Sequence, residues 1–186
     1  MPEADDRDAL SLLARRDARG FDLAYARYAE RIFGFLVRLS GSRALAEDLF
    51  QHTFMRLAQA GPTLRADSDL RAWLFSVARN AFYGHARARR VAASAAPELL
   101  PLPSGDAAPD AALVVQELER ALARLNEDDR ELLLLVAVEG LSHAEVAQVL
   151  EVDPVTVRKR VSRARARLSQ VLDAQAVIVS ESEWSE

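Results

Sequence analysis

The chain has 186 residues, of which 50% are hydrophobic and 28% are charged, a balance typical of folded soluble proteins and not of disordered ones. It contains no cysteine, which excludes disulfide scaffolds, thiolate catalysis and cysteine-ligated zinc. No apolar run approaches the roughly 20 residues that cross a bilayer, and the acidic start MPEADDRD lacks the pattern of a signal peptide. We therefore expect a cytoplasmic protein.

The net charge of −4 argues against a nucleic-acid-binding protein, but the charges are unevenly distributed. Residues 154–172 carry six basic side chains and no acidic one, whereas residues 173–186 carry four acids and no base. Of the 24 basic residues, all but Lys159 are arginine, whose planar guanidinium suits phosphates and guanine edges. A GC-rich genome would also produce this arginine bias, so both explanations stay open at this point.

Apolar residues recur at helical spacing along the chain, and no segment alternates with a period of two. This predicts an all-α fold of two small helical domains joined by a flexible linker. Four of the seven prolines fall in residues 92–110, which we expect to be that linker. The first domain then covers residues 7–91, the second covers 111–172, and an acidic tail covers 173–186.

The first domain contains three expected helices. The first carries one long apolar face and ends near Gly41. The second begins near Ser42 and is ended by Gly61 and the proline that follows. The third begins at Asp67 or Ser68 and continues into a run of arginines, whose charge suits the C-terminal end of a helix.

The second domain has clearer helix boundaries. Ser142 and Glu145 form an S-x-x-E capping box, which predicts a short helix to Leu150. Asp153 can cap a last helix that has Pro154 at its first position, where the missing N–H costs nothing. A short helix, a tight turn and a basic helix are typical of a helix-turn-helix, although an ordinary helical hairpin with a solvated basic face would give the same pattern.

A helical wheel assigns the faces of the basic helix. Val157, Val161 and Leu168 fall on one stripe, which we expect to face the core. The opposite edge would reach DNA bases and the flanking cations would reach phosphates, because a solubilising face would usually include glutamates and this one has none. The predicted DNA-binding residues are Thr156, Arg158, Lys159, Arg160, Ser162, Arg163, Arg165 and Arg167.

Three stretches of the chain resemble bacterial sigma factors of the sigma-70 family, and more narrowly the extracytoplasmic-function (ECF) group. They are ALAEDLFQHTFMRL, DLRAWLFSVARN and LLLLVAVEGLSHAEVAQVLEVDPVTVRKRVSRARARL. The resemblance covers roughly residues 7–91 and 111–172. It implies a protein that binds core RNA polymerase and directs it to promoters by recognising their −10 and −35 elements. The implied partners are core RNA polymerase, through its β′ clamp helices and β flap, promoter DNA, and an anti-sigma factor.

The resemblance also assigns roles to individual residues. Those that match the polymerase-binding helix are Glu47, Asp48, Gln51 and Phe54, and those expected to contact the −10 element are Arg71, Arg79, Asn80 and Arg87. The helix over 154–172 matches the part that reads the −35 element. One departure concerns Glu151, which stands where the turn of the helix-turn-helix usually has glycine. A non-glycine residue in a left-handed turn costs about 1 kcal/mol.

No enzyme site is predicted. The three histidines lie in separate expected helices without metal-ligand spacing, and no glycine-rich phosphate loop is present. We therefore expect no catalysis, cofactor or metal. Two alternatives to a sigma factor remain open: an autonomous helix-turn-helix regulator that binds duplex DNA as a dimer, and an interaction protein that has kept the fold but lost DNA binding.

Overall fold

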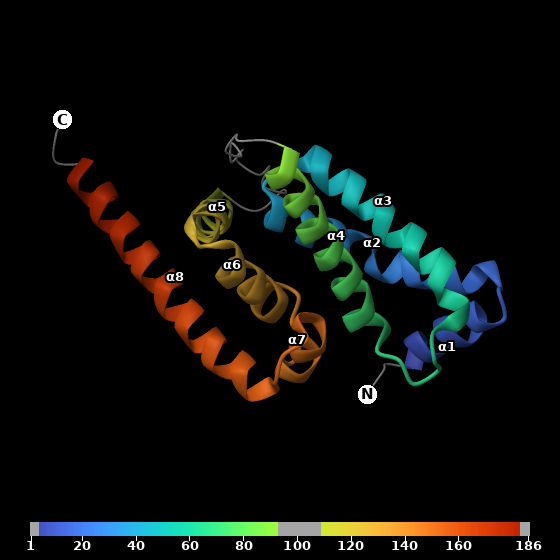
Figure 1. Cartoon of the computed structure of the whole chain (residues 1–186). Coiled ribbons are helices and arrows are strands. Elements are labelled where there is room, and N and C mark those ends of the chain that lie inside the picture. Colours follow the sequence, from blue (N-terminus) through green and yellow to red (C-terminus); the bar gives the residue numbers. More distant parts are fainter. Residues whose placement is uncertain (1–3, 93–108, 183–186) are drawn as a thin grey trace.

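The computed structural model describes residues 4–92 and 109–182, and within these ranges every regular element is helical. Figure 1 shows them in chain order, from blue to red. They are α1 (Ala4–Ala14), α2 (Ala18–Ser40), α3 (Arg43–Ala60), a 3-10 turn at Gly61–Thr63, α4 (Leu70–Ala92), α5 (Pro109–Arg124), α6 (Glu127–Leu133), a π-helical turn at Leu134–Val138, α7 (His143–Leu150) and α8 (Pro154–Ser182). The all-α prediction is confirmed. Most of the expected linker lies outside the described residues.

Helices α1 to α4 form the first helical group (Figure 1). The apolar stripe of α2 is buried against α3 and α4, and the rings of Phe35 and Phe75 meet edge to face at its centre, 5.3 Å apart. Helix α1, which the sequence reasoning did not predict, packs directly on α2 at Gly20. A Cβ atom at that glycine would lie 2.6 Å from the backbone nitrogen of Leu13, so only glycine permits this close approach.

The ends of the first-domain helices follow from capping. Helix α2 ends at Gly41, which adopts the left-handed conformation with φ 65°, and Ser42 then caps α3 by accepting a hydrogen bond from the backbone of Leu45. Helix α4 begins at Leu70, slightly later than expected. The cap is Asp69, whose carboxylate accepts a 2.9 Å hydrogen bond from the backbone nitrogen of Ala72.

The predicted helix-turn-helix is present in the second domain. The capping box of Ser142 and Glu145 opens α7, and Glu151 ends it in the left-handed conformation with φ 54°. The Asp153 carboxylate then accepts a 2.7 Å hydrogen bond from the backbone of Val155 and starts α8. Helix α8 does not end near residue 172 but runs to Ser182, so much of the expected acidic tail is helical.

The two helical groups pack against each other. Helix α4 of the first group lies along α7 of the second, and α2 contacts α6 and the π-helical turn (Figure 1). Buried apolar residues from both groups belong to one continuous core. None of the helices in the described ranges is long and apolar enough to span a membrane.

Candidate nucleic-acid interface

Helix α8 presents the faces that the helical wheel predicts. Val157 and Val161 are buried against the rest of the second domain, together with Ala164. The seven predicted DNA-binding residues from Arg158 to Arg167 are exposed, and Thr156 is half-buried. The helix is held in this orientation because it packs on both α6 and α7. Contact of these side chains with DNA stays a prediction.

Arg167 differs from the other cations of α8 because an acidic side chain of its own domain binds it. Its guanidinium donates a hydrogen bond to the carboxylate of Asp129 in α6, and the two form an ion pair. Asp129 is almost buried and also accepts a 2.7 Å hydrogen bond from the amide of Asn126. About half of the Arg167 side chain remains exposed, so a phosphate could still reach it.

An open cavity of about 450 Å³ lies between α4 and α8. Its walls include Arg79 of the first domain and Arg160, Arg163 and Arg167 of the second, with Glu131 among the acidic residues beside them. The structure therefore brings one residue expected to contact the −10 element close to three expected to contact the −35 element.

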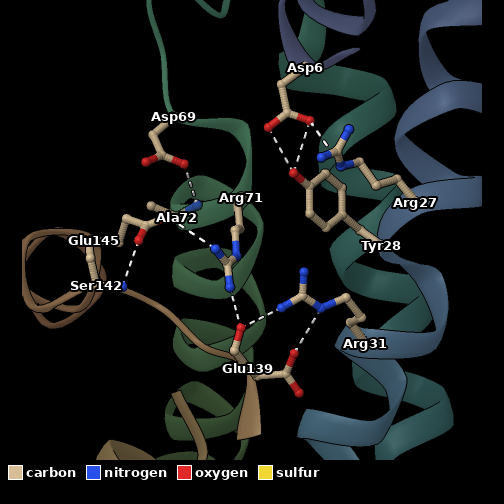
Figure 2. Close-up of polar contacts among 10 residues, drawn as sticks. All are labelled: Asp6, Arg27, Tyr28, Arg31, Asp69, Arg71, Ala72, Glu139, Ser142 and Glu145. Atoms are coloured by element: carbon tan, nitrogen blue, oxygen red, sulfur yellow. Dashed lines mark hydrogen bonds and ion pairs between the residues drawn. The ribbon is translucent and has the colours of Figure 1, made fainter. Parts of the chain in front are cut away.

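Two of the four residues expected to contact the −10 element are bound by the second domain. Arg71 donates a 3.3 Å hydrogen bond to the Glu145 carboxylate and another to the backbone carbonyl of Glu139 (Figure 2). The Nε atom of Arg79 lies 2.8 Å from a carboxylate oxygen of Glu131. The other two residues, Asn80 and Arg87, are exposed on α4.

Sequence reasoning missed three residues that join the domains. Arg31 of α2 binds the Glu139 carboxylate, with 3.1 Å between Nε and Oε2, and also donates to the Glu139 carbonyl (Figure 2). Arg130 of α6 is buried and donates to three carbonyls at the C-terminal end of α5, as well as to the carbonyl of Leu39 in α2 at 3.4 Å. No local pattern marks the contacts that join the domains, because Arg31 and Glu139 are 108 positions apart and Arg130 and Leu39 are 91 positions apart.

Burial changes the acid–base properties of the interdomain carboxylates. Glu131 is 2% exposed, and this burial raises its pKa to about 7, although Arg79 and Tyr83 act in the opposite direction. Burial also raises the pKa of Glu139, which the charge of Arg31 partly offsets. The pKa of Tyr83 is raised by burial and by Glu131, whose carboxylate accepts a 3.2 Å hydrogen bond from the Tyr83 hydroxyl.

The four residues that resemble a polymerase-binding site lie on α3 but differ in exposure. Glu47, Asp48 and Gln51 are exposed, and Glu47 pairs with Arg43 one turn earlier at 3.1 Å. Phe54 is 5% exposed, and its ring packs edge to face on Tyr25 and beside Phe50. Phe54 is therefore part of the packed interior beneath α3, whereas the three polar residues form the exposed surface of that helix.

The comparisons with protein families match both helical groups. Residues 24–91 match the family described as Sigma-70 region 2, and residues 115–168 match Sigma-70, region 4. The RNA polymerase sigma-H factor of Pseudomonas aeruginosa is 31% identical over 185 residues, which cover 92% of this chain and 96% of that protein. The ECF RNA polymerase sigma factor EcfG of Rhodopseudomonas palustris is 35% identical over 143 residues, which cover 74% of this chain and 77% of that protein.

Solved structures agree with these matches. The sigma factor RpoE from Bartonella quintana, in a co-crystal with the anti-sigma factor NepR, superposes with a TM-score of 0.74 at 30% identity, over 82% of this chain and 96% of that one. CnrH, in complex with the cytosolic domain of CnrY, superposes with a TM-score of 0.71 at 28% identity, over 91% of this chain and 98% of that one. These relatives support a sigma factor and not an autonomous dimeric regulator. The chain belongs to the ECF group of the sigma-70 family of RNA polymerase sigma factors.

Proposed function

We propose that the chain binds core RNA polymerase and directs it to promoters that carry particular −10 and −35 elements. The observation that carries this proposal is the exposed, acid-free basic face of α8 on a helix-turn-helix, in a chain of the sigma-70 family. The chain itself would catalyse nothing, because polymerase supplies the active site. It would act in the cytoplasm, where its polymerase and DNA are found.

Recognition of the −35 element would use the outward edge of α8 in the major groove. Lys159, Ser162 and Arg163 point away from the buried stripe, so they are suited to hydrogen bonds with base edges. Arg158 and Arg165 on one shoulder of the helix are suited to one phosphate backbone, and the cations on the other shoulder are suited to the other. Phosphate contacts would position the helix, and base contacts would select the sequence.

The first domain would contact the −10 element and core RNA polymerase. Asn80 and Arg87 are exposed on α4 and available to the −10 element. On α3, the carboxylates of Glu47 and Asp48 and the amide of Gln51 form a polar surface over a packed aromatic cluster, which suits a basic partner surface such as that of the β′ clamp helices.

We also infer that an anti-sigma factor binds this chain. The support is that two relatives of similar fold, RpoE and CnrH, were solved in complexes, the first with an anti-sigma factor and the second with the cytosolic domain of CnrY.

The test of the proposed function is reconstitution with purified core RNA polymerase. The full chain should co-purify with core polymerase, and the holoenzyme should enrich promoters from a randomised DNA library and produce run-off transcripts from them. An otherwise identical preparation that lacks the chain is the control. Binding of the chain alone to a palindromic duplex as a dimer, without affinity for core polymerase, would contradict the proposal.

A further inference from the structure

The open cavity between α4 and α8 has guanidinium groups from both domains on its walls. They belong to Arg79 of α4 and to Arg160, Arg163 and Arg167 of α8. The three from α8 share one face of the helix because they are three and four positions apart. Like charges gathered in one place repel one another, so an anion between them would stabilise the cluster. We propose that this cavity binds a small polyphosphate, either the phosphate chain of a nucleotide or an inorganic chain.

The four guanidinium groups have hydrogen-bond donors to spare. Asp129 accepts a hydrogen bond from Arg167, and Glu131 pairs with Arg79 through its Nε atom. A guanidinium has five N–H donors, so neither acid uses all the donors of its partner. Arg160 and Arg163 are exposed, and no acidic residue in the described part of the chain forms an ion pair with either of them.

The carboxylates on the same walls do not balance the cations. They come from Asp128, Asp129 and Glu131, and stand against four guanidinium groups. Burial also raises the pKa of Glu131 to about 7, so this carboxyl is ionised in only about half of the molecules at neutral pH. The cavity therefore keeps an excess of positive charge, which attracts an anionic ligand and not a cation.

The volume of the cavity favours a small ligand over DNA. About 450 Å³ lies within the range of about 300–1,000 Å³ that small-molecule sites occupy. A DNA duplex, whose major groove alone is about 12 Å wide, is too large to enter it. A short phosphate chain can accept paired hydrogen bonds from several guanidinium forks at once. Leu132 and Leu150 also line the cavity and offer an apolar surface to the base or sugar of a nucleotide.

Arg163 belongs both to this cavity and to the face proposed to read the −35 element. Its guanidinium cannot bind a phosphate chain in the cavity and a base edge in the major groove at the same time. The polyphosphate and −35 DNA should therefore exclude each other. Only this consequence rests on the proposed function, because binding of a polyphosphate to the free chain needs neither polymerase nor a promoter.

The test is calorimetric titration of the free, full-length chain with GTP and, separately, with tripolyphosphate, both with Mg²⁺ at constant ionic strength. Arg160→Ala should weaken binding about tenfold, because it removes charge-assisted hydrogen bonds to phosphate. Arg79→Gln should also weaken it, because Arg79 is the contribution of the first domain. Arg158→Ala removes the same charge from the opposite shoulder of α8, outside the cavity, and should weaken binding less than about twofold.

The two probes distinguish the sources of the phosphate chain. Tighter binding of GTP than of tripolyphosphate would identify a nucleotide, and equal or weaker binding of GTP would identify the chain alone. No heat of binding from either probe would overturn the inference. Equal losses in Arg158→Ala and Arg160→Ala would also overturn it, because they would indicate general attraction to a basic helix. Arg160 is exposed and unpaired, so this comparison holds even if Arg79→Gln fails to fold.

A second titration tests the exclusion of DNA. Saturating tripolyphosphate should weaken binding of a −35 duplex by the free wild-type chain at constant ionic strength, and unchanged binding would contradict the exclusion. Failure of the proposed function would show separately, as a chain that binds the polyphosphate but gives no transcription with core polymerase.

Discussion

Burial of Glu131 makes the stability of the folded chain depend on pH. The pKa of this carboxyl is raised from 4.5 to about 7 by burial, with Arg79 and Tyr83 opposing the shift and Asp128 adding to it. The folded chain therefore binds a proton more tightly than the unfolded chain does. The contribution of Glu131 to the free energy of unfolding should be complete at and below about pH 4.5, fall as the pH rises towards 7, and level off above that. At about 1.4 kcal/mol per pKa unit, the fall is at most about 3 kcal/mol.

Replacement of Glu131 by glutamine tests this reasoning, because an amide keeps the shape but cannot ionise. Urea unfolding of the wild type and of Glu131→Gln should give similar free energies at pH 5. At pH 8 the variant should be the more stable protein, by up to about 3 kcal/mol. Glu117→Gln, at an exposed position, is the matched control and should follow the wild type. If Glu131→Gln is the less stable protein at pH 8, the carboxylate is ionised and its pairing with Arg79 dominates.

Three further predictions concern the proposed function. Arg163→Ala should cost about 1–3 kcal/mol of promoter binding and relax the preference at one base pair, measured with the holoenzyme on single-base −35 variants. Arg167→Ala should weaken binding about equally on all sequences and reduce the salt dependence by roughly one phosphate contact. If instead Arg167→Ala changes the sequence preference and Arg163→Ala does not, α8 is rotated from the predicted orientation. Charge reversal of Glu47 and Asp48 to lysine should abolish competition for core polymerase while the circular dichroism spectrum stays helical; unchanged affinity would contradict that site.

The parts of the fold that the sequence predicts well are those set by local chemistry. Ser142 and Glu145 cap α7 through their own side chains, and Asp153 starts α8 in the same way. The buried stripe of α8 follows from helical periodicity alone, because Val157 and Val161 must share a face at that spacing. Such signals need only a few neighbouring residues, so the helix-turn-helix and its outward face can be found without a structure.

Helix α1 shows why other parts could not be predicted. Its buried apolar side chains are few, among them Leu10 and Leu13, so its periodic signal is weak. A helix this short is marginal in isolation and depends on tertiary packing, here against α2 at Gly20. That glycine lies in a different helix, and nothing in the α1 segment itself indicates the close approach.

Contacts between the domains are harder still to predict, because arginine binds carboxylates and phosphates equally well. A guanidinium presents planar donors that fit either anion, so the family resemblance implied DNA contacts for Arg71 and Arg79, and nothing in the sequence indicated Glu145 or Glu131 as their partners. Arg31 and Glu139 are separated by 108 positions, and the chain offers 23 arginines as possible partners.

The same chemistry pairs two of the arginines expected to contact DNA with acids of the second domain. Arg167 on α8 is bound by Asp129, just as Arg71 on α4 is bound by Glu145. In each case an acidic residue of the second domain occupies a guanidinium that a phosphate would otherwise bind. The partly buried pair of Arg71 and Glu145 is screened less by salt than an exposed pair would be, so it competes best against a single weakly bound anion. Promoter DNA presents many phosphates at once, and its binding energy grows with each one engaged. The acids of the second domain would therefore suppress weak, non-specific attraction more than they suppress a promoter that engages both domains.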